Sequence, residues 1–291
     1  MKVLGLLASY RRQGNSEVFL KEALMGAEDE GAEVEILRLT NYNIRPCTAC
    51  GRCATGLKPC HLSDQFMWLL EKVYTYDAII LGSPVYYLTT PAILKLFSDR
   101  TVCEGYPTPL LGKPCAMILT YGNRGYNAYA FTVPNGLFLK WGMKVIDRAL
   151  IHSTSPGDAF LDRVNQVRSK EIGRAVARAT RTGEATYLGE PGVCPVCNDR
   201  IIRILKDNKT IQCPTCGIRG RLRFVGEELR AEFTEEAIRM GRFSPEQWYQ
   251  HHMYHVELGK AWFMASKDQR KVIRKKYLTY LAPKVEEPAE S

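Results

Sequence analysis

The sequence lacks any apolar run long enough to cross a membrane. Its first apolar stretch, Val3–Leu7, is far shorter than the roughly 20 residues that a spanning helix needs. It is not a signal peptide either, because no small-residue cleavage site follows and Arg11 and Arg12 come soon after. We therefore expect a soluble, cytoplasmic protein that does not bind membranes.

Neither sign of charge is strongly in excess. The chain of 291 residues has 40 Lys and Arg against 31 Asp and Glu, a formal net charge of +9. This mild excess is spread along the chain, so it argues against nucleic acid as the main partner. It favours acidic partners such as a small electron-carrier protein or a phosphate-bearing cofactor.

Two common nucleotide motifs are also missing. The chain contains neither the dinucleotide fingerprint G-x-G-x-x-G nor a P-loop lysine. Instead, the loop from Ser9 to Ser16 joins a predicted strand to a predicted helix. Unpaired N–H groups and the helix dipole favour an anion there, and Ser9, Arg11, Asn15 and Ser16 add donors. The loop alone fits either a single phosphate or an ordinary capped turn.

Cysteine is not scarce, and eight of the ten cysteines fall into two quartets. In a cytoplasmic protein this indicates metal rather than disulfides. The first quartet has the spacing C-x2-C-x2-C-x6-C within the loop 45–62. Its members are Cys47, Cys50, Cys53 and Cys60. Four thiolates this close suit one [4Fe–4S] cluster, and the open alternatives are a zinc or redox-disulfide site or inert cysteines.

The second quartet has the spacing of a zinc ribbon. Two C-x2-C pairs, Cys194/Cys197 and Cys213/Cys216, are separated by fifteen residues. Four sulfurs would complete a tetrahedral structural Zn²⁺ site, and metal binding would supply the folding energy of so small a module. Rubredoxin-like iron is the alternative. The two remaining cysteines, Cys103 and Cys115, are predicted to be packing residues.

Five predicted strands alternate with predicted helices over residues 1–187. The strands are expected at 2–8, 34–39, 78–81, 115–119 and 144–150, and the helices at 17–31, 63–74, 90–100, 127–141 and 159–182. This order predicts an α/β, doubly wound, flavodoxin-like parallel sheet. A zinc-ribbon-like β module at 188–235 and a helical segment at 236–291 are expected to follow.

Three loops are expected to meet at the carboxyl edge of this sheet. The first is Ser9–Ser16, the second contains Pro84, Val85, Tyr86 and Tyr87, and the third is Thr120–Gly122. The second offers aromatic faces at the position where ligands of such sheets bind. Glycines in the third would let backbone approach a ring. One loop for a phosphate and two for a flat heterocycle predict an FMN site.

These motifs together resemble the iron–sulfur flavoproteins, a branch of the flavodoxin-like NADPH-dependent FMN reductases. The resemblance covers about residues 1–180 and rests on three motifs: Ser9-x-Arg11-x-x-Gly14-Asn15-Ser16, the first quartet, and Gly82–Tyr87 with the segment up to Asp99-Arg100. It implies that the first loop holds the FMN phosphate and that Pro84–Tyr87 and Thr120, Tyr121 and Gly122 border the ring. It also implies a homo-oligomer in which each cluster lies near a neighbour's flavin. Asp99 and Arg100 are expected to be structural, holding a helix end or a subunit contact, and a catalytic role is the open alternative.

The predicted function is electron transfer from a ferredoxin-type donor, through a [4Fe–4S] cluster and FMN, to a quinone, O2, peroxide or a small organic acceptor. No side chain is nominated as a catalytic acid or base. One alternative is an NAD(P)H-dependent FMN or quinone reductase. A second is a redox-sensing protein that binds nucleic acid through the ribbon.

Overall fold

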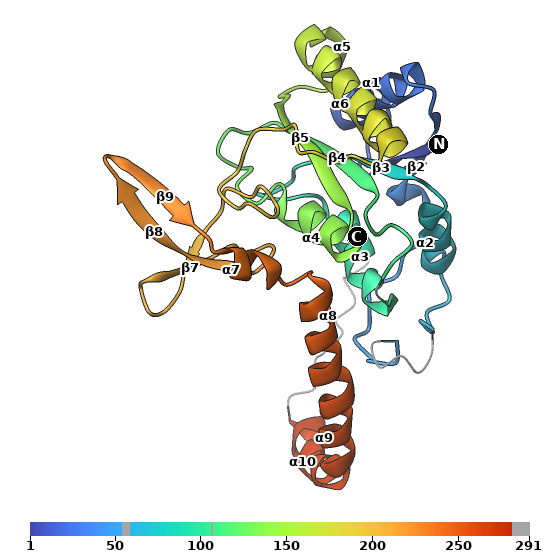
Figure 1. The fold of residues 1–291 in the computed structure, drawn as a ribbon. Helices are drawn as coiled ribbons and strands as arrows, with labels where there is room; N and C mark the ends of the chain where they lie inside the picture. Colours follow the sequence, from blue (N-terminus) through green and yellow to red (C-terminus); the bar gives the residue numbers. More distant parts are fainter. Residues whose placement is uncertain (54–58, 106, 281–291) are drawn as a thin grey trace. The chain divides into compact units, whose positions relative to one another are not determined.

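A computed structural model describes residues 1–53, 59–105 and 107–280 of the chain (Figure 1). It divides the chain into two compact units, Met1–Gln247 and Trp248–Ser291. The first unit contains a parallel sheet with its helices and a smaller antiparallel sheet. The tail 284–291, for which the sequence predicts disorder, lies outside the described residues.

The parallel sheet has five strands in the order β2-β1-β3-β4-β5. This is the flavodoxin-like order, and it confirms the predicted fold class. The strand order changes direction between β1 and β3: from β1 the chain first adds β2 on one side and then β3 to β5 on the other. Ligands of such sheets bind at the carboxyl ends of the strands at this switch point. The strands are β1 (Lys2–Leu7), β2 (Glu33–Arg38), β3 (Ala78–Pro84), β4 (Pro114–Tyr121) and β5 (Lys144–His152).

Helices cover both faces of this sheet (Figure 1). Side chains along β1 alternate between the two faces, as a strand requires: Leu4 and Leu6 pack under one layer of helices, and Val3 and Leu7 under the other. The first layer consists of α2 (Phe66–Tyr74), α3 (Ala92–Arg100) and α4 (Thr132–Lys140), and the second of α1 (Asn15–Asp29) and α6 (Arg163–Thr182). Burial on both faces explains why the three central strands, β1, β3 and β4, are short, nearly continuous apolar runs.

Two helical segments differ most from those that the sequence predicts. The helix expected from residue 127 begins at Thr132, because residues 123–131 form turns instead. The helix expected over 159–182 is divided into a short α5 (Asp158–Leu161) and α6. Asp162 lies between them, and its carboxylate accepts a hydrogen bond from the Asn165 backbone N–H at 3.0 Å. Asp162 is thus an N-cap, which starts a new helix at this point.

The second sheet is antiparallel and has the order β6-β7-β8-β9. Its strands are β6 (Arg203–Ile204), β7 (Thr210–Gln212), β8 (Arg219–Val225) and β9 (Glu228–Glu232), followed by the short helix α7 (Glu235–Arg239). β6 and β7 form a hairpin, and Asp207 accepts hydrogen bonds from the backbone of Lys209 and Thr210 at its turn. The core of this module is made mainly of the four cysteines of the second quartet and Ile218.

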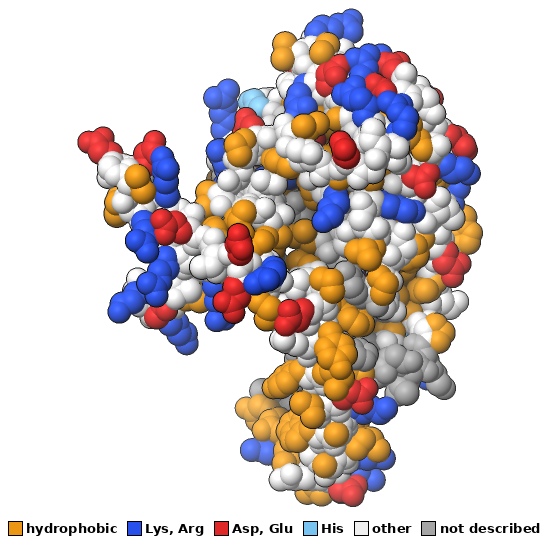
Figure 2. Space-filling model, in the orientation of Figure 1, with side chains coloured by type: hydrophobic (Ala, Val, Ile, Leu, Met, Phe, Trp, Pro, Cys, Tyr) orange, Lys and Arg blue, Asp and Glu red, His pale blue; other side chains and the backbone are white. Residues whose placement is uncertain are grey.

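The second unit is helical. It contains most of α8 (Pro245–His252), a π-helical stretch (Met253–Leu258), α9 (Gly259–Ala265) and α10 (Lys267–Thr279). Many large apolar side chains on it are exposed, among them Trp262, Met264 and Tyr277, and Figure 2 shows hydrophobic side chains gathered over this segment. No helix in the described ranges is long and apolar enough to cross a bilayer.

Candidate functional site: a sheet edge and two cysteine quartets

The three predicted loops meet at the carboxyl edge of the parallel sheet. The Ala8 N–H donates to the Gly82 carbonyl at 2.9 Å, and the Val85 N–H donates to the Thr120 carbonyl at 2.7 Å. The hydroxyls of Ser16 and Thr120 share a buried hydrogen bond of 2.6 Å. These contacts join the ends of β1, β3 and β4 to the start of α1. The structure therefore brings Ser16, Val85 and Thr120 together, as the sequence predicts.

The start of α1 leaves backbone donors available for an anion. Its N-cap is Gly14, which has no side chain with which to bond the first N–H groups. The Asn15 side chain is already bonded to another segment. It donates to the Ser155 carbonyl at 2.8 Å and accepts from the N–H groups of Gly157 and Ala159. Asn15 thus fastens the first loop to residues 155–159, and its own backbone remains in the first turn.

Two residues that sequence reasoning missed shape the first loop. Arg38, from the end of β2, donates to the Ser9 carbonyl at 2.7 Å and to the Glu17 carboxylate at 2.5 Å. Glu17 also accepts from the Gln13 N–H at 2.6 Å. Burial raises the pKa of Glu17, but hydrogen bonds from Lys21, Arg38 and Gln13 outweigh it and hold the pKa below its ordinary value. The negative charge near the helix start is thereby neutralised, and an anion can bind there.

The second loop is a tight, strained turn. Tyr86 and Thr89 exchange two backbone hydrogen bonds, and the residues between them, Tyr87 and Leu88, have φ angles of +41° and +75°. Such angles cost about 1–2 kcal/mol for each residue other than glycine, so the turn depends on its surroundings. Its support is the loop after β4, where Leu88 bonds to Tyr126 and Tyr129 through the backbone. The turn exposes the Tyr87 side chain by 85%.

The third loop leaves open space next to that turn. A Cβ at Gly122 would meet only ordinary contacts, the nearest 3.7 Å away, whereas Gly125 has a φ of +81° that favours glycine. The Tyr121 ring packs 5.1 Å from the His152 ring, and His152 Nε2 donates to the Gly122 carbonyl at 3.0 Å. His152 follows from the end of β5 and was not predicted. The edge is therefore lined by aromatic side chains around an open backbone, an arrangement suited to a flat ring.

The first cysteine quartet lies on a loop that a buried arginine holds at both ends. Arg100 is 2% exposed and donates to the Arg45 carbonyl at 2.9 Å and to the Cys60 sulfur at 3.4 Å. It also pairs with the buried carboxylate of Asp64, which accepts from the Arg45 N–H at 2.9 Å. Arg100 therefore holds the cysteine loop, which differs from the helix end or subunit contact expected from the sequence.

The four sulfurs of this loop do not converge as a single-ion site would require. Cys47 and Cys50 are exposed, Cys53 and Cys60 are half-buried, and the described residues contain one compact ligand group, which is elsewhere. In a cluster each sulfur binds a different iron, so its ligands lie farther apart than those of one ion. Hydrogen bonds from the Arg52 backbone and the Thr48 side chain lower the pKa of the Cys50 thiol. The donor set, four cysteine sulfurs on one loop, fits a metal centre of the kind that four thiolates can hold.

The two cysteines outside the quartets, Cys103 and Cys115, have raised thiol pKa values, whereas the pKa of Cys50 is lowered. Cys115 is fully buried in β4, and burial raises the pKa of its thiol. Burial also raises the pKa of Cys103 to about 11, with smaller contributions from Glu104, Cys53 and Cys60. Both thiols remain protonated and fit the packing role expected of them.

The second quartet converges on one point. Cys194, Cys197, Cys213 and Cys216 are buried, and their sulfurs lie within 4.8 Å of one another. The Cys194–Cys216 and Cys197–Cys213 sulfurs are 3.3 and 3.5 Å apart, against about 3.8 Å for four sulfurs at zinc-ligand distance. Four thiolates at such distances repel one another unless a cation lies between them. The site fits a tetrahedral metal ion.

Two matching turns build this second site. In each, the residue after the second cysteine has a positive φ, +54° at Asn198 and +78° at Gly217. Asp199 joins the turns by accepting from the Thr215 hydroxyl at 2.7 Å. Arg242 bonds the backbone of the second turn at Pro214, Thr215 and Cys216. The repeat of two turns predicts a preformed metal site, as in zinc ribbons.

Comparisons with known proteins agree with this geometry. The family model of NADPH-dependent FMN reductases matches residues 1–155. An iron–sulfur flavoprotein of Archaeoglobus fulgidus is 33% identical over 192 residues, 66% of this chain and 84% of that protein. Flavone synthase cfoJ of Aspergillus candidus is 29% identical over 260 residues, 77% of this chain and 79% of that protein.

A solved structure named flavone reductase shares the fold of nearly the whole chain. It has a TM-score of 0.81 at 23% identity and covers 99% of this chain and 100% of its own. The similarity therefore extends past the parallel sheet into the ribbon and the C-terminal helices.

Proposed function

The chain belongs to the NADPH-dependent FMN reductase family and is a flavin oxidoreductase, and within that family we propose that it works as an iron–sulfur flavoprotein. The main observation behind the proposal is the buried Arg100. It donates hydrogen bonds to the Arg45 carbonyl and the Cys60 sulfur and pairs with the Asp64 carboxylate, and so holds the cysteine loop. A buried arginine that holds an exposed loop is expected where the cysteine sulfurs of that loop must keep fixed positions to bind a metal centre.

The residues that would hold FMN lie at the carboxyl edge of the sheet. The phosphate would bind at the start of α1, where Gly14, Asn15 and Ser16 contribute backbone N–H groups and Ser9 and Arg11 flank the loop. The ring would lie against residues 84–87, with Thr120, Tyr121 and Gly122 on its other side. Arg11 is exposed, so its guanidinium can turn toward a phosphate.

The residues that would hold the [4Fe–4S] cluster are Cys47, Cys50, Cys53 and Cys60, and the second quartet would hold Zn²⁺ as a structural ion. When bound, the cluster would take single electrons from a ferredoxin-type donor, and FMN would store two and release them to a quinone, O2, peroxide or a small organic acceptor. Arg100 would hold the Cys60 sulfur in position through its 3.4 Å hydrogen bond.

We also propose a homo-oligomer in which the cysteine loop faces a neighbouring subunit. The support is the exposure of Cys47 and Cys50, because a cluster open to solvent would be attacked by oxygen. Light scattering would give the mass. Mixing a Cys50→Ser variant with a variant that cannot bind FMN would restore ferredoxin-dependent turnover if the cofactors of different subunits cooperate. A monomer, or a mixture without turnover, would contradict the arrangement.

Anaerobic spectroscopy and rapid mixing test the function. Protein purified without oxygen should contain iron, sulfide, flavin and zinc, and a Cys50→Ser variant should lose iron and sulfide while keeping flavin and zinc. Reduced ferredoxin should bleach the flavin of the intact protein quickly and that of the variant slowly. Colourless protein with neither flavin nor sulfide would exclude the proposal.

A second candidate is an NAD(P)H-dependent flavin reductase that acts directly on a small aromatic substrate. It is favoured by the 260-residue similarity to a protein named flavone synthase, which is longer than the flavin-binding part of this chain. Fast bleaching of the flavin by NADPH, unchanged in Cys50→Ser, would favour this candidate. A flavone could then be offered as the electron acceptor.

A further inference from the structure

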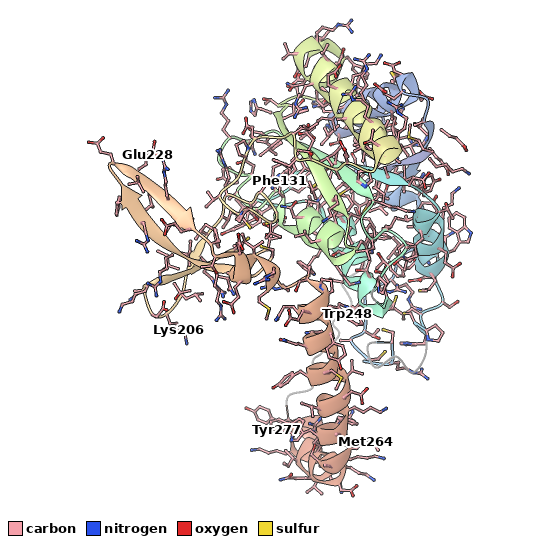
Figure 3. The ribbon with its side chains drawn as sticks, viewed as in Figure 1. Phe131, Lys206, Glu228, Trp248, Met264 and Tyr277 are labelled. Atoms are coloured by element: carbon pink, nitrogen blue, oxygen red, sulfur yellow. The ribbon has the colours of Figure 1, made fainter. Side chains whose placement is uncertain are left out.

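A pocket of about 440 Å³ lies beside β5 and the loop before α4. One wall comes from the parallel-sheet domain, with Phe131, Thr132 and Arg148, and the other from the linker and the ribbon, with Tyr187 and Arg200. Figure 3 labels Phe131 next to β5, where the chain leading to the ribbon passes. Its volume lies within the range of small-molecule sites, roughly 300–1,000 Å³.

The central residue of this pocket is Arg148. Its guanidinium stacks 4.5 Å from the Phe131 ring centre, donates from Nε to the Tyr187 hydroxyl at 3.2 Å, and donates from Nη2 to the Asn198 carbonyl. All three partners are neutral. Within the described residues, Arg148 forms no ion pair with a carboxylate, and its buried Nη1 has no hydrogen-bond partner. A half-buried cation without a counter-ion is costly.

A second unsatisfied group belongs to the same pocket. The Thr132 hydroxyl is buried and likewise has no partner in the described ranges. Two carboxylates also line the pocket, Asp199 and Glu190. Asp199 accepts from the Ile201 N–H and the Thr215 hydroxyl, and among the described residues neither carboxylate forms an ion pair with Arg148. The pocket therefore offers two unused buried donors, Arg148 Nη1 and the Thr132 hydroxyl.

We propose that this pocket binds a small aromatic carboxylate. Two donors, Arg148 Nη1 and the Thr132 hydroxyl, match the two oxygens of a carboxylate, and Arg200 adds positive charge at the rim. The remaining walls mix polar and apolar residues, and the apolar part, with Leu150, Ile151 and Ile201 beside the Phe131 ring, suits a flat ring. The ligand would bridge the parallel-sheet domain and the ribbon, so its binding would stabilise their contact.

The proposal is tested by titrating the purified full-length protein with benzoate and following binding by calorimetry. Benzyl alcohol, which lacks the charge, and acetate, which lacks the ring, serve as matched ligands. Benzoate should bind at least about tenfold more tightly than either. Benzyl alcohol loses a hydrogen bond to a charged group, and acetate loses the burial of the ring.

Variants identify the site. Thr132→Val and Arg200→Gln should each weaken benzoate binding, Thr132→Val by roughly tenfold and Arg200→Gln by less because its charge is exposed. Arg239→Gln, at an exposed position on α7, removes the same charge elsewhere and should leave binding unchanged. No heat of binding, equal binding by all three ligands, or insensitivity to Thr132→Val would each overturn the proposal.

Discussion

The two cysteine quartets of this chain contain the same four thiols but differ in where their order comes from. In the second, the sulfurs are buried, lie within 4.8 Å of one another and form much of the core of their own module. In the first, two of the four cysteines are exposed, and the order comes from outside, through Arg100 and Asp64. The second quartet is therefore part of the fold, whereas the first is an addition that the fold supports.

The largest expected difference between the quartets is the effect of losing one ligand of the second. Cys213→Ser should release the metal and unfold the ribbon, because metal binding contributes about 10–16 kcal/mol in comparable zinc peptides and the module has little other core. Hydrogen exchange should show lost protection across residues 193–225, with the parallel sheet unchanged. Cys103→Ser, outside both quartets, is the control. A protected ribbon without metal would contradict this account.

Removing the external support of the first quartet should have the next largest effect. Arg100→Met leaves the buried Asp64 carboxylate without its partner and should lower the free energy of unfolding by about 3–5 kcal/mol. Urea denaturation measures the loss. Lys95→Met breaks an exposed pair with Asp99 on the same helix and should cost about 0.5 kcal/mol or less. Equal losses for both variants would mean that Arg100 does not hold the loop.

The ion pair between Asp64 and Arg100 should be sensitive to acid. Burial raises the pKa of Asp64, but hydrogen bonds from Arg100 and from the N–H groups of Arg45 and Phe66 outweigh it, so the pKa lies below its ordinary value. The resulting stability is present above the unfolded-state pKa of about 3.9 and is lost as pH falls through the lower folded-state pKa. The urea midpoint of the parent protein should therefore fall more steeply below about pH 4 than that of Asp64→Asn. Parallel pH profiles would argue against the assignment.

The fold was predictable because its signals are local. The strands are short apolar runs, and helices and strands alternate along the chain, so the five-stranded sheet could be derived from neighbouring residues alone. The C-x2-C pairs of the second quartet are equally local. The sheet and the second quartet could therefore be predicted without knowing which residues far apart in the sequence are in contact.

The contacts that shape the sites were not predictable, because they join residues far apart in sequence. Arg100 of α3 contacts Arg45 and Asp64, which lie on either side of the first quartet. Arg38 of β2 contacts Glu17 of α1. Asn15 looked like a phosphate ligand, but its side chain is bound to residues 155–159. No pattern in a single sequence marks such pairs. The late start of α4 was missed for a related reason, since the loop before it is fixed by backbone bonds to Leu88.

A smaller effect is expected where the second quartet meets the sheet domain. Asn135 of α4 is fully buried and donates to the Cys197 carbonyl at 3.3 Å. Asn135→Ala should weaken this attachment by about 1 kcal/mol, the usual value of one neutral hydrogen bond. Faster hydrogen exchange at residues 194–199, with metal still bound, would report it. The exposed Asn41→Ala is the control, and loss of the metal would show that the site depends on α4 more than its own turns suggest.

The smallest effect on stability should come from the first quartet itself. Cys47 is exposed, and the contact recorded for its sulfur is a 3.4 Å hydrogen bond from the Ala49 N–H, which a serine oxygen can also accept. Cys47→Ser should therefore change the free energy of unfolding by no more than about 0.5 kcal/mol. Iron and sulfide should nevertheless be lost, because serine supplies no thiolate. Urea denaturation and metal analysis on the same preparation separate these outcomes. A Cys47→Ser protein that unfolds early would place the first quartet in the fold, like the second, and remove the distinction between them.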